Sequence, residues 1–207
     1  MIVVVDYGMG NLHSVSKALV TAGAQVRVTD EPDVVARAEA LVVPGVGAFG
    51  DAMAALRGRG LDQAVVEFIA TGRPFLGICL GLQILFDEGF EDGRHRGLGV
   101  LRGQCVPLPT DRTGPDGRRL KVPHMGWNNL EVVRRSPVLE DFPDGGQVYF
   151  VHSYAVEPED ESVVSTRTEY GAPFVSSIWR ENVVATQFHP EKSQQVGLAM
   201  LRRFIEL

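Results

Sequence analysis

The N-terminal half of the chain alternates short apolar runs with segments of helical periodicity, and this alternation limits the available folds more than any other feature. The apolar runs predict strands at 2–6, 25–29, 41–43 and 74–78, the third ending before Pro44-Gly45. The periodic segments predict helices at 11–22, 32–38, 61–70 and 80–88. Strands and helices that alternate in this way form a parallel sheet with helices on both faces. We therefore expect an α/β fold with a mostly parallel central sheet.

The C-terminal half has a different pattern, in which strand signals follow one another without intervening helices. These signals predict strands at 99–106, 129–133, 147–150, 163–168, 175–179 and 183–187. A last helix is predicted at 194–205, with apolar residues spread along one side. No internal repeat and no change of composition marks a domain boundary. We expect one domain, residues 1–207, whose sheet has an antiparallel β extension.

Charge and cysteine content exclude several classes of function. Twenty Lys and Arg against 26 Asp and Glu give a formal net charge of −6, which argues against nucleic acid or an anionic membrane as a partner. The two cysteines, Cys79 and Cys105, are too few for a disulfide scaffold, and no spacing suits a metal site. No apolar stretch approaches the ~20 residues of a membrane span. We expect a reduced, cytoplasmic protein without a bound metal.

One cysteine lies where a nucleophile could be exposed. Cys79 stands between a predicted buried strand and a predicted helix, with glycines two residues away on each side in Gly77-Ile78-Cys79-Leu80-Gly81. The serine version of this arrangement is the nucleophile elbow. In such a turn the helix N-terminus favours the thiolate, and the N–H of Leu80 supplies half an oxyanion hole. A buried core cysteine between two packing glycines is the alternative that this segment alone leaves open.

A nucleophilic cysteine needs a base, and His189 is the best candidate. It follows a predicted strand in Phe188-His189-Pro190-Glu191, and Pro190 keeps it extended. Residues i and i+2 of an extended segment face the same side, so Glu191 can orient the imidazole. A loop with a surface ion pair is the alternative for this segment taken by itself.

A glycine-rich segment, Pro44-Gly45-Val46-Gly47-Ala48-Phe49-Gly50, contains the spacing of a dinucleotide-binding loop. It follows the third strand instead of the first, and Pro44 interrupts the strand-to-helix turn. The acidic residue about 20 positions later, Glu67, falls inside a predicted helix. We therefore interpret the segment as a loop in which Val46 and Gly47 offer backbone N–H groups to an oxyanion; a plain connecting loop is the alternative.

Together these segments carry a resemblance to a known family. The motifs occur in a fixed order over essentially the whole chain: residues 6–11 (DYGMGN), 44–49 (PGVGAF), 76–83 (LGICLGLQ), 123–128 (PHMGWN), 149–154 (YFVHSY) and 187–193 (QFHPEKS). The chain resembles the class I, triad-type glutamine amidotransferases and, within them, the glutaminase subunits of imidazole glycerol phosphate synthase. The resemblance implies a flavodoxin-like amidotransferase fold that uses no cofactor.

The resemblance also implies a reaction. Glutamine is hydrolysed to glutamate and ammonia by a triad of Cys79, His189 and Glu191. The ammonia passes to a cyclase subunit, a (β/α)8 barrel that forms a heterodimer with the glutaminase. That subunit makes imidazole glycerol phosphate and an aminoimidazole carboxamide ribotide in histidine biosynthesis.

Further residues take roles by resemblance. The residues around glutamine are Gly47, Gln83, Glu91 and Ser153. Gln83 lies four residues after Cys79 on the predicted helix and so faces the same side; a solvated helix residue is the alternative. The residues at the cyclase interface are Asn11, Pro123, Met125, Trp127, Asn128 and Lys192. Pro123 and Gly126 are expected to form a turn that exposes the large apolar side chains of Met125 and Trp127. The alternative is that Trp127 packs inward.

Three other functions use the same fold. The chain could be the glutaminase of another synthase, a free-standing cysteine hydrolase, or a non-catalytic regulatory subunit. The motifs at 6–11 and 123–128 argue against the first two. The presence of Cys79, His189 and Glu191 together argues against the third.

Overall fold

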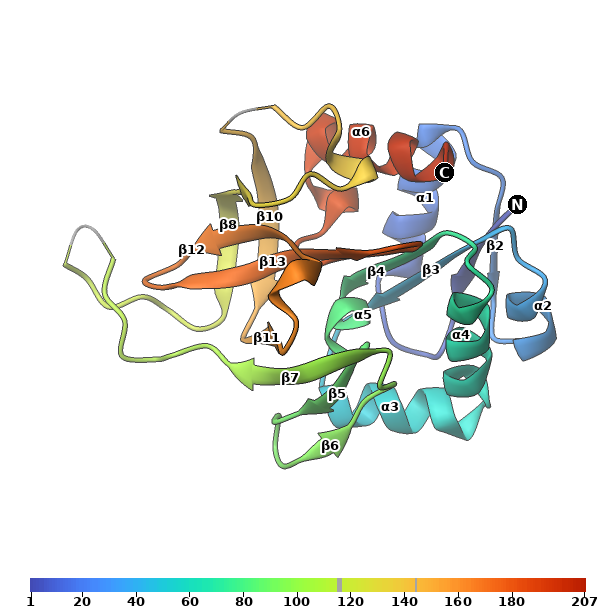
Figure 1. The fold of residues 1–207 in the computed structure, drawn as a ribbon, viewed down its shortest axis with the longest axis horizontal. Coiled ribbons are helices and arrows are strands. Elements are labelled where there is room, and N and C mark those ends of the chain that lie inside the picture. The colour runs from blue at the N-terminus through green and yellow to red at the C-terminus, as the bar shows by residue number, and fades with distance from the viewer. Residues whose placement is uncertain (115–116, 144) are drawn as a thin grey trace.

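The computed structural model describes residues 1–114, 117–143 and 145–207. In this part of the chain a 12-stranded sheet runs through the molecule, and a separate two-stranded ribbon lies beside it (Figure 1). The termini lie near each other at the end where β1 and β2 are found (Figure 1).

One half of the sheet is parallel and combines the first four strands of the chain with the last one. Its neighbouring strands are, in order, β2 (Val26–Thr29), β1 (Ile2–Val5), β3 (Ala40–Gly45), β4 (Phe75–Cys79) and β14 (Val183–Thr186). All four pairings are parallel. The last strand of the chain therefore lies beside β4, which is the strand that ends at Cys79.

The sheet continues beyond β14 as an antiparallel extension. Its path contains β13 (Pro173–Arg180), β11 (Tyr154–Pro158), β7 (Leu101–Pro107), β5 (Phe86–Gly89) and β6 (His95–Arg96); β12 (Val164–Glu169) pairs with β13 and with β9 (Glu131–Val132). One pairing within it, β5 with β7, is parallel. The predicted fold class, a mostly parallel central sheet with an antiparallel extension, is confirmed.

Helices cover both faces of the parallel half. Helices α1 (Leu12–Ala22) and α6 (Gln194–Ile205) contact each other on one face. The other face carries α2 (Pro32–Ala36), α3 (Phe49–Gly58) and α4 (Leu61–Ala70). Alternate residues of a strand enter opposite cores: Ile2 and Val4 pack towards α1 and α6, whereas Val3 and Val5 pack towards the second layer. This double burial explains why the strands read as continuous apolar runs.

The helix predicted at 80–88 is wrong for most of its length. Only Leu80–Gln83 is helical (α5), and the chain then forms β5 at Phe86–Gly89. Because Leu82, Ile84 and Leu85 are all buried, the apolar run has no exposed side whose periodicity could separate helix from strand. Gly89, at the end of β5, packs against the ring of Phe49. A Cβ at this position would lie 2.5 Å from the ring, so the packing requires glycine.

The third strand does not end before Pro44. It runs through Gly45, which pairs with Cys79. Pairing with β1 reaches only Val42, so the N–H that Pro44 lacks is not required on that side. The helix that follows, α3, was not predicted, because its first turn shares the glycine-rich segment assigned to a loop.

The ribbon consists of β8 (His124–Asn129) and β10 (Gln147–His152). The turn expected at Pro123–Gly126 is wrong, because this segment enters the ribbon as a strand after a cis peptide bond between Val122 and Pro123. Strand alternation, rather than a turn, leaves Met125 and Trp127 exposed on one side. Among the described residues, no helix is long and apolar enough to span a membrane.

Candidate active site

Cys79 is held in a turn with strained backbone geometry. It is the last residue of β4 and precedes α5, with φ of +56° and ψ of −108°. The flanking glycines are required by close packing: a Cβ on Gly81 would lie 1.9 Å from the carbonyl oxygen of Val43, and one on Gly77 would lie 2.5 Å from the carbonyl oxygen of Gly81. A positive φ at a non-glycine residue is uncommon and is found at functional sites. Since α5 has four residues, the helix contributes less to the thiolate than a longer one would.

His189 and Glu191 form a buried pair. The His189 Nδ1 and Glu191 Oε1 atoms are 2.7 Å apart, and the two side chains are 3% and 1% exposed. Pro190 begins the short 3-10 helix that holds Glu191 beside the imidazole. The second ring nitrogen of His189, Nε2, is buried and faces Cys79, with no other hydrogen-bond partner among the described residues. The imidazole is thus oriented on one side and free to exchange a proton on the other.

The pKa of His189 reflects its two neighbours. Burial acts to lower this pKa, but hydrogen bonding and the negative charge of Cys79 and Glu191 outweigh burial and raise it to about 9. The imidazole therefore favours its protonated form beside the sulfur. This electrostatic coupling joins two residues that are 110 positions apart in the sequence.

Strand pairing explains why Cys79 and His189 lie close together in the fold. β14 lies parallel to β4, and Thr186 pairs with Ile78, so the residues after both strands emerge at the same edge of the sheet. Gln187, fully buried, comes next and donates from Nε2 to Cys79 Sγ at 3.5 Å. His189 follows two residues later on the extended chain.

Strand β10 contacts both Cys79 and the segment that carries His189. The carbonyl oxygen of Val151 lies 3.9 Å from Cys79 Sγ. The N–H of His189 donates to the carbonyl oxygen of Tyr149 at 2.9 Å, and Ser193 Oγ accepts from the N–H of Tyr149 at 3.0 Å. The ribbon is therefore hydrogen-bonded directly to the segment that carries the imidazole.

A pocket of about 290 Å³ opens beside Cys79. The residues lining it are Val46, Gly47, Cys79, Leu80, Gln83, Glu91, Pro123, Val151, His152, Ser153 and Tyr154. It contains all four residues expected around glutamine and all three expected at the oxyanion hole. Their roles remain predictions, but the fold brings these residues together from β3, β4, β10 and the connections between them.

Two polar side chains shape the pocket. Gln83 is buried, and its Nε2 donates to Gln187 Oε1 at 3.0 Å and to the carbonyl oxygen of Tyr154 at 3.3 Å. The alternative of a solvated helix residue is therefore wrong. Glu91 Oε2 accepts from the N–H of Phe49 at 2.7 Å, which fixes the carboxylate at the start of α3. Within the described ranges, no group of three or more His, Cys, Asp or Glu side chains is placed to hold a metal ion.

The residues expected at a partner interface lie on two neighbouring parts of the molecule. Met125 and Trp127, 62% and 43% exposed, project from β8, with Trp127 edge-on to the ring of Tyr149. Lys192 lies over the same ring, with Nζ 5.8 Å from its centre. The inward-packed alternative for Trp127 is wrong, and the role in partner binding remains a prediction.

The three remaining interface candidates also have structural contacts, and one of them, Pro123, lines the pocket beside Cys79. Asn11 caps α1 by accepting from the N–H of Ser14. Asn128 Nδ2 donates to the carbonyl oxygen of Glu169 at 2.9 Å.

Sequence reasoning missed two residues next to the nucleophile. Gln187 could have been predicted in the same way as Glu191, because residues 187, 189 and 191 are spaced by two along an extended segment and so face the same side. Tyr7 is buried under the end of β3, and its hydroxyl donates to the carbonyl oxygen of Pro44 at 2.9 Å. No local signal separates Tyr7 from an ordinary aromatic residue after a strand.

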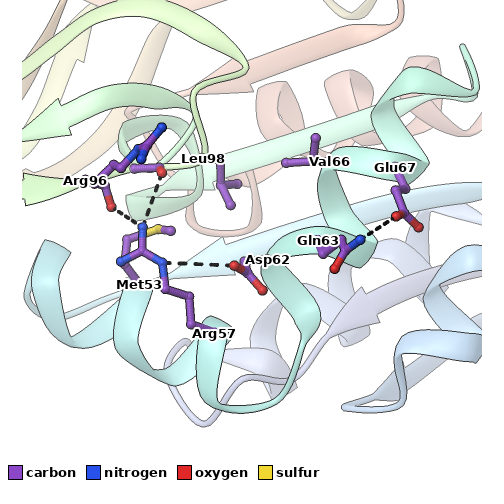
Figure 2. Close-up of a pocket in the computed structure, with 9 residues that line it drawn as sticks. Met53, Arg57, Asp62, Gln63, Val66, Glu67, Arg96 and Leu98 are labelled. Carbon is purple, nitrogen blue, oxygen red and sulfur yellow. Dashed lines mark hydrogen bonds and ion pairs between the residues drawn. The ribbon is translucent and has the colours of Figure 1, made fainter.

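A larger pocket, of about 600 Å³, lies elsewhere and contains none of the predicted site residues. It lies between α3, α4 and the segment after β6 (Figure 2). The guanidinium of Arg57 already has partners in this pocket. It donates to the carbonyl oxygen of Arg96 at 2.7 Å and lies 4.0 Å from the carboxylate of Asp62, and both interactions are drawn in Figure 2. The residues that line this pocket include no thiol, hydroxyl or imidazole side chain.

Comparison with known proteins identifies the class. The family model for class-I glutamine amidotransferase matches residues 3–207. Among solved structures, the chain is similar to a glutamine amidotransferase (TM-score 0.74, 22% identity, 100% of this chain and 98% of the other). It is also similar to PurLQS from Thermotoga maritima (TM-score 0.73, 19% identity, 99% and 97%). At these identities the structures show a common fold. The chain belongs to the class-I glutamine amidotransferase family.

Closer relatives narrow the assignment. The chain is 53% identical over 204 residues to imidazole glycerol phosphate synthase subunit HisH of Syntrophotalea carbinolica, covering 99% of this chain and 98% of the relative. It is 54% identical over 203 residues to the subunit of the same name from Aquifex aeolicus, covering 98% and 94%. Within the family it therefore belongs with the imidazole glycerol phosphate synthase subunits HisH, and the resemblance stated from its motifs is confirmed.

Proposed function

We propose that this chain is the glutaminase subunit of an imidazole glycerol phosphate synthase, hydrolysing glutamine to glutamate and ammonia. The observation that carries the proposal is the placement of Cys79, at a strained strand-to-helix turn, beside the buried pair of His189 and Glu191. A nucleophile, a base and a group that orients the base are what amide hydrolysis through a covalent intermediate requires.

The first chemical step transfers a proton before it forms a bond. Cys79 passes its proton to His189, whose raised pKa of about 9 favours this transfer. The sulfur attacks the side-chain amide carbon of glutamine, and His189 gives the proton to the departing nitrogen, which leaves as ammonia. Glu191 keeps the imidazole oriented through both transfers. A thioester remains on Cys79, and water activated by His189 hydrolyses it to glutamate.

Negative charge develops on the amide oxygen during both attacks. The N–H groups of Leu80 and of the Val46–Gly47 segment are the proposed donors to this oxygen, since both segments line the pocket beside Cys79. The free end of glutamine carries an ammonium and a carboxylate. Glu91 supplies a fixed carboxylate for the ammonium, and Gln83 and Ser153 supply polar groups for the remaining atoms. The pocket volume of about 290 Å³ suits one amino acid.

We further propose a cyclase partner with a (β/α)8 barrel, bound as a heterodimer across the exposed side of β8 and the neighbouring Asn11 and Lys192. The exposed Met125 and Trp127 support this surface. Because β10 is hydrogen-bonded to the segment that carries His189, a partner that binds the ribbon can shift the catalytic groups through these bonds. We propose a cytoplasmic location, in keeping with the free thiols of Cys79 and Cys105.

The test measures glutamate release from glutamine by the wild-type chain and by Cys79→Ala, alone and with a barrel cyclase subunit and its ribotide ligand. We expect weak hydrolysis alone, strong stimulation by the liganded partner, and none with Cys79→Ala. Brisk hydrolysis without a partner would favour a free-standing hydrolase. No hydrolysis by the wild type in any mixture would contradict the proposal and favour a non-catalytic subunit.

A further inference from the structure

A buried tyrosine hydroxyl lies under the loop that is proposed to bind the oxyanion. Tyr7, 1% exposed, follows β1 and donates from its hydroxyl to the carbonyl oxygen of Pro44 at 2.9 Å. Burial and the nearby charge of Cys79 raise the pKa of Tyr7, so its hydroxyl keeps its proton and remains a donor. The catalytic steps described above do not use this group.

The hydroxyl occupies a narrow space next to Gly45. A Cβ on Gly45 would lie 2.3 Å from Tyr7 Oη and 2.8 Å from Leu80 Cβ. Gly45 also pairs with Cys79 in the β3–β4 register. The tyrosine hydroxyl and Leu80, whose N–H is proposed as the other half of the oxyanion hole, therefore both lie against the side of Gly45 that has no Cβ.

The residues after Tyr7 contact the same loop further along. A Cβ on Gly10 would lie 3.4 Å from the carbonyl oxygen of Pro44, and one on Gly47 would lie 2.6 Å from Met9 Cε. The connection between β1 and α1 thus follows the loop from Pro44 to Gly47. Of these contacts, the hydroxyl of Tyr7 makes the only hydrogen bond that the structure records between the two described segments.

The pairing of β3 with β4 restrains the loop as far as Gly45, but beyond it no hydrogen bond to another described residue is recorded for Val46 or Gly47. Gly47 has φ of +99°, in a region where glycine moves freely, and Pro44 has no N–H with which to tie the end of β3. A hydrogen bond to the Pro44 carbonyl fixes the plane of the Pro44–Gly45 peptide and hence the direction in which the following peptides leave the strand.

We propose that Tyr7 is a positioning residue for glutamine hydrolysis, whose hydroxyl orients the Pro44–Gly47 loop so that a loop N–H meets the oxyanion. The inference rests on the proposed function. Tyr7 touches neither the substrate nor the sulfur in this mechanism. It acts on the transition state, where the oxyanion is fully charged, and not on glutamine binding.

The test compares Tyr7→Phe with the wild-type chain in the complex with the liganded cyclase. Losing one oxyanion donor lowers kcat by about 10²–10³-fold, so misaligning one is expected to lower kcat roughly tenfold. We expect KM to change less than about twofold. Alkylation of Cys79 by iodoacetamide, followed on the Cys79 peptide by mass spectrometry, creates no oxyanion and should proceed at the wild-type rate.

Tyr170→Phe is the matched control, since it removes a tyrosine hydroxyl that donates to the carbonyl oxygen of Lys121 at 2.7 Å near the surface. It should retain the wild-type kcat. Met9→Ala, which loosens the contact with Gly47 without disturbing a buried hydroxyl, should lower kcat in the same direction by a smaller factor.

Three results would overturn the inference. The first is a kcat of Tyr7→Phe within about twofold of the wild type. The second is a parallel fall in alkylation rate, which would place the effect on the thiol instead of the loop. The third, a wild-type chain without glutaminase activity in the complex, is recognised separately because it refutes the proposed function as well.

Discussion

Single residues set the geometry around Cys79, the proposed nucleophile. Cys79 keeps a positive φ only because its neighbours leave no alternative path from β4 into α5. Gly77 and Gly81 touch each other and Val43 through backbone atoms, which cannot move aside as a flexible side chain could. The turn that places Cys79 at the wall of the pocket therefore depends on two positions without side chains.

Gly81→Ala should destabilise the protein by about 2–4 kcal/mol, because its Cβ would overlap a backbone carbonyl. Thermal and chemical unfolding measure the change. Gly58→Ala is the matched control: it lies in α3, a Cβ there meets nothing within 4 Å, and we expect a gain of up to about 1 kcal/mol. A Gly81→Ala protein as stable as the wild type would contradict the close packing.

The protonation of His189 depends on two neighbours. Cys79 and Glu191 together raise its pKa to about 9 against the opposing effect of burial. Glu191→Gln keeps a hydrogen-bonding group but removes the charge, so the pKa of His189 should fall, and Cys79→Ala should also lower it. NMR titration of the imidazole C–H protons measures both. An unchanged titration in Glu191→Gln would mean that the carboxylate does not act on the imidazole.

At the scale of elements, the β8–β10 ribbon encloses a histidine pair. His124 and His152 face each other across the strands, with His124 Nδ1 and His152 Nε2 3.0 Å apart, and His124 lies between the rings of Phe150 and Tyr170. Burial lowers the pKa of His124 to about 4, and burial, partly offset by the hydrogen bond to the Tyr154 carbonyl, lowers that of His152 to about 3. Both imidazoles are therefore neutral in the folded protein at neutral pH.

This pair predicts acid sensitivity. The unfolded chain binds protons at its histidines near pH 6.5, but the folded ribbon does not, so the stabilising contribution is present above about pH 6.5. It is lost as the pH falls through about 4. The free energy of unfolding should fall between pH 7 and 5, as urea unfolding measures, and His124→Gln should reduce that fall. His13→Gln, on the exposed side of α1, should leave it as in the wild type. An equal fall in His124→Gln would refute the explanation.

At the scale of the whole molecule, the pairing of the last strand with β4 assembles the site. The chain leaves β4 at Cys79, builds the antiparallel extension, and returns through β14 to the same edge of the sheet. The extension also carries the ribbon, so that the surface proposed for the partner and the imidazole belong to one hydrogen-bonded unit.

Trp127→Ala should weaken binding of the cyclase by roughly 30-fold, about 2 kcal/mol, if the exposed indole anchors the interface. Calorimetry or surface plasmon resonance measures the dissociation constant. Val133→Ala removes an exposed apolar side chain next to β9 and should change that constant less than about twofold. Equal effects of both variants would place the interface elsewhere.

Parts of the fold could be predicted from the sequence because they depend on local patterns of residues. The limits of α6 and α4 were predicted to the residue, since each has one buried and one exposed side. The helix predicted at 80–88 is wrong because residues 80–86 are all buried, which hides any periodicity. The turn predicted in place of β8 is wrong because Pro123 and Gly126, although turn-forming residues, here lie just before the strand and within it. In the site, Gln83 and Glu91 line the pocket as expected, whereas Tyr7 could not be foreseen.

The sequence by itself determined the alternation of strands and helices and the motifs that define the family, and it predicted a cysteine, a histidine and an acid suited to amide hydrolysis. These depend on neighbours within a few positions, where periodicity and residue type suffice. Only the tertiary structure decided which strand lies beside β4, how Gln187 and Val151 approach the sulfur, and that a tyrosine lies beneath the Pro44–Gly47 loop. Those contacts join residues more than 35 positions apart, and close packing of the folded chain, which no local pattern encodes, sets their distances.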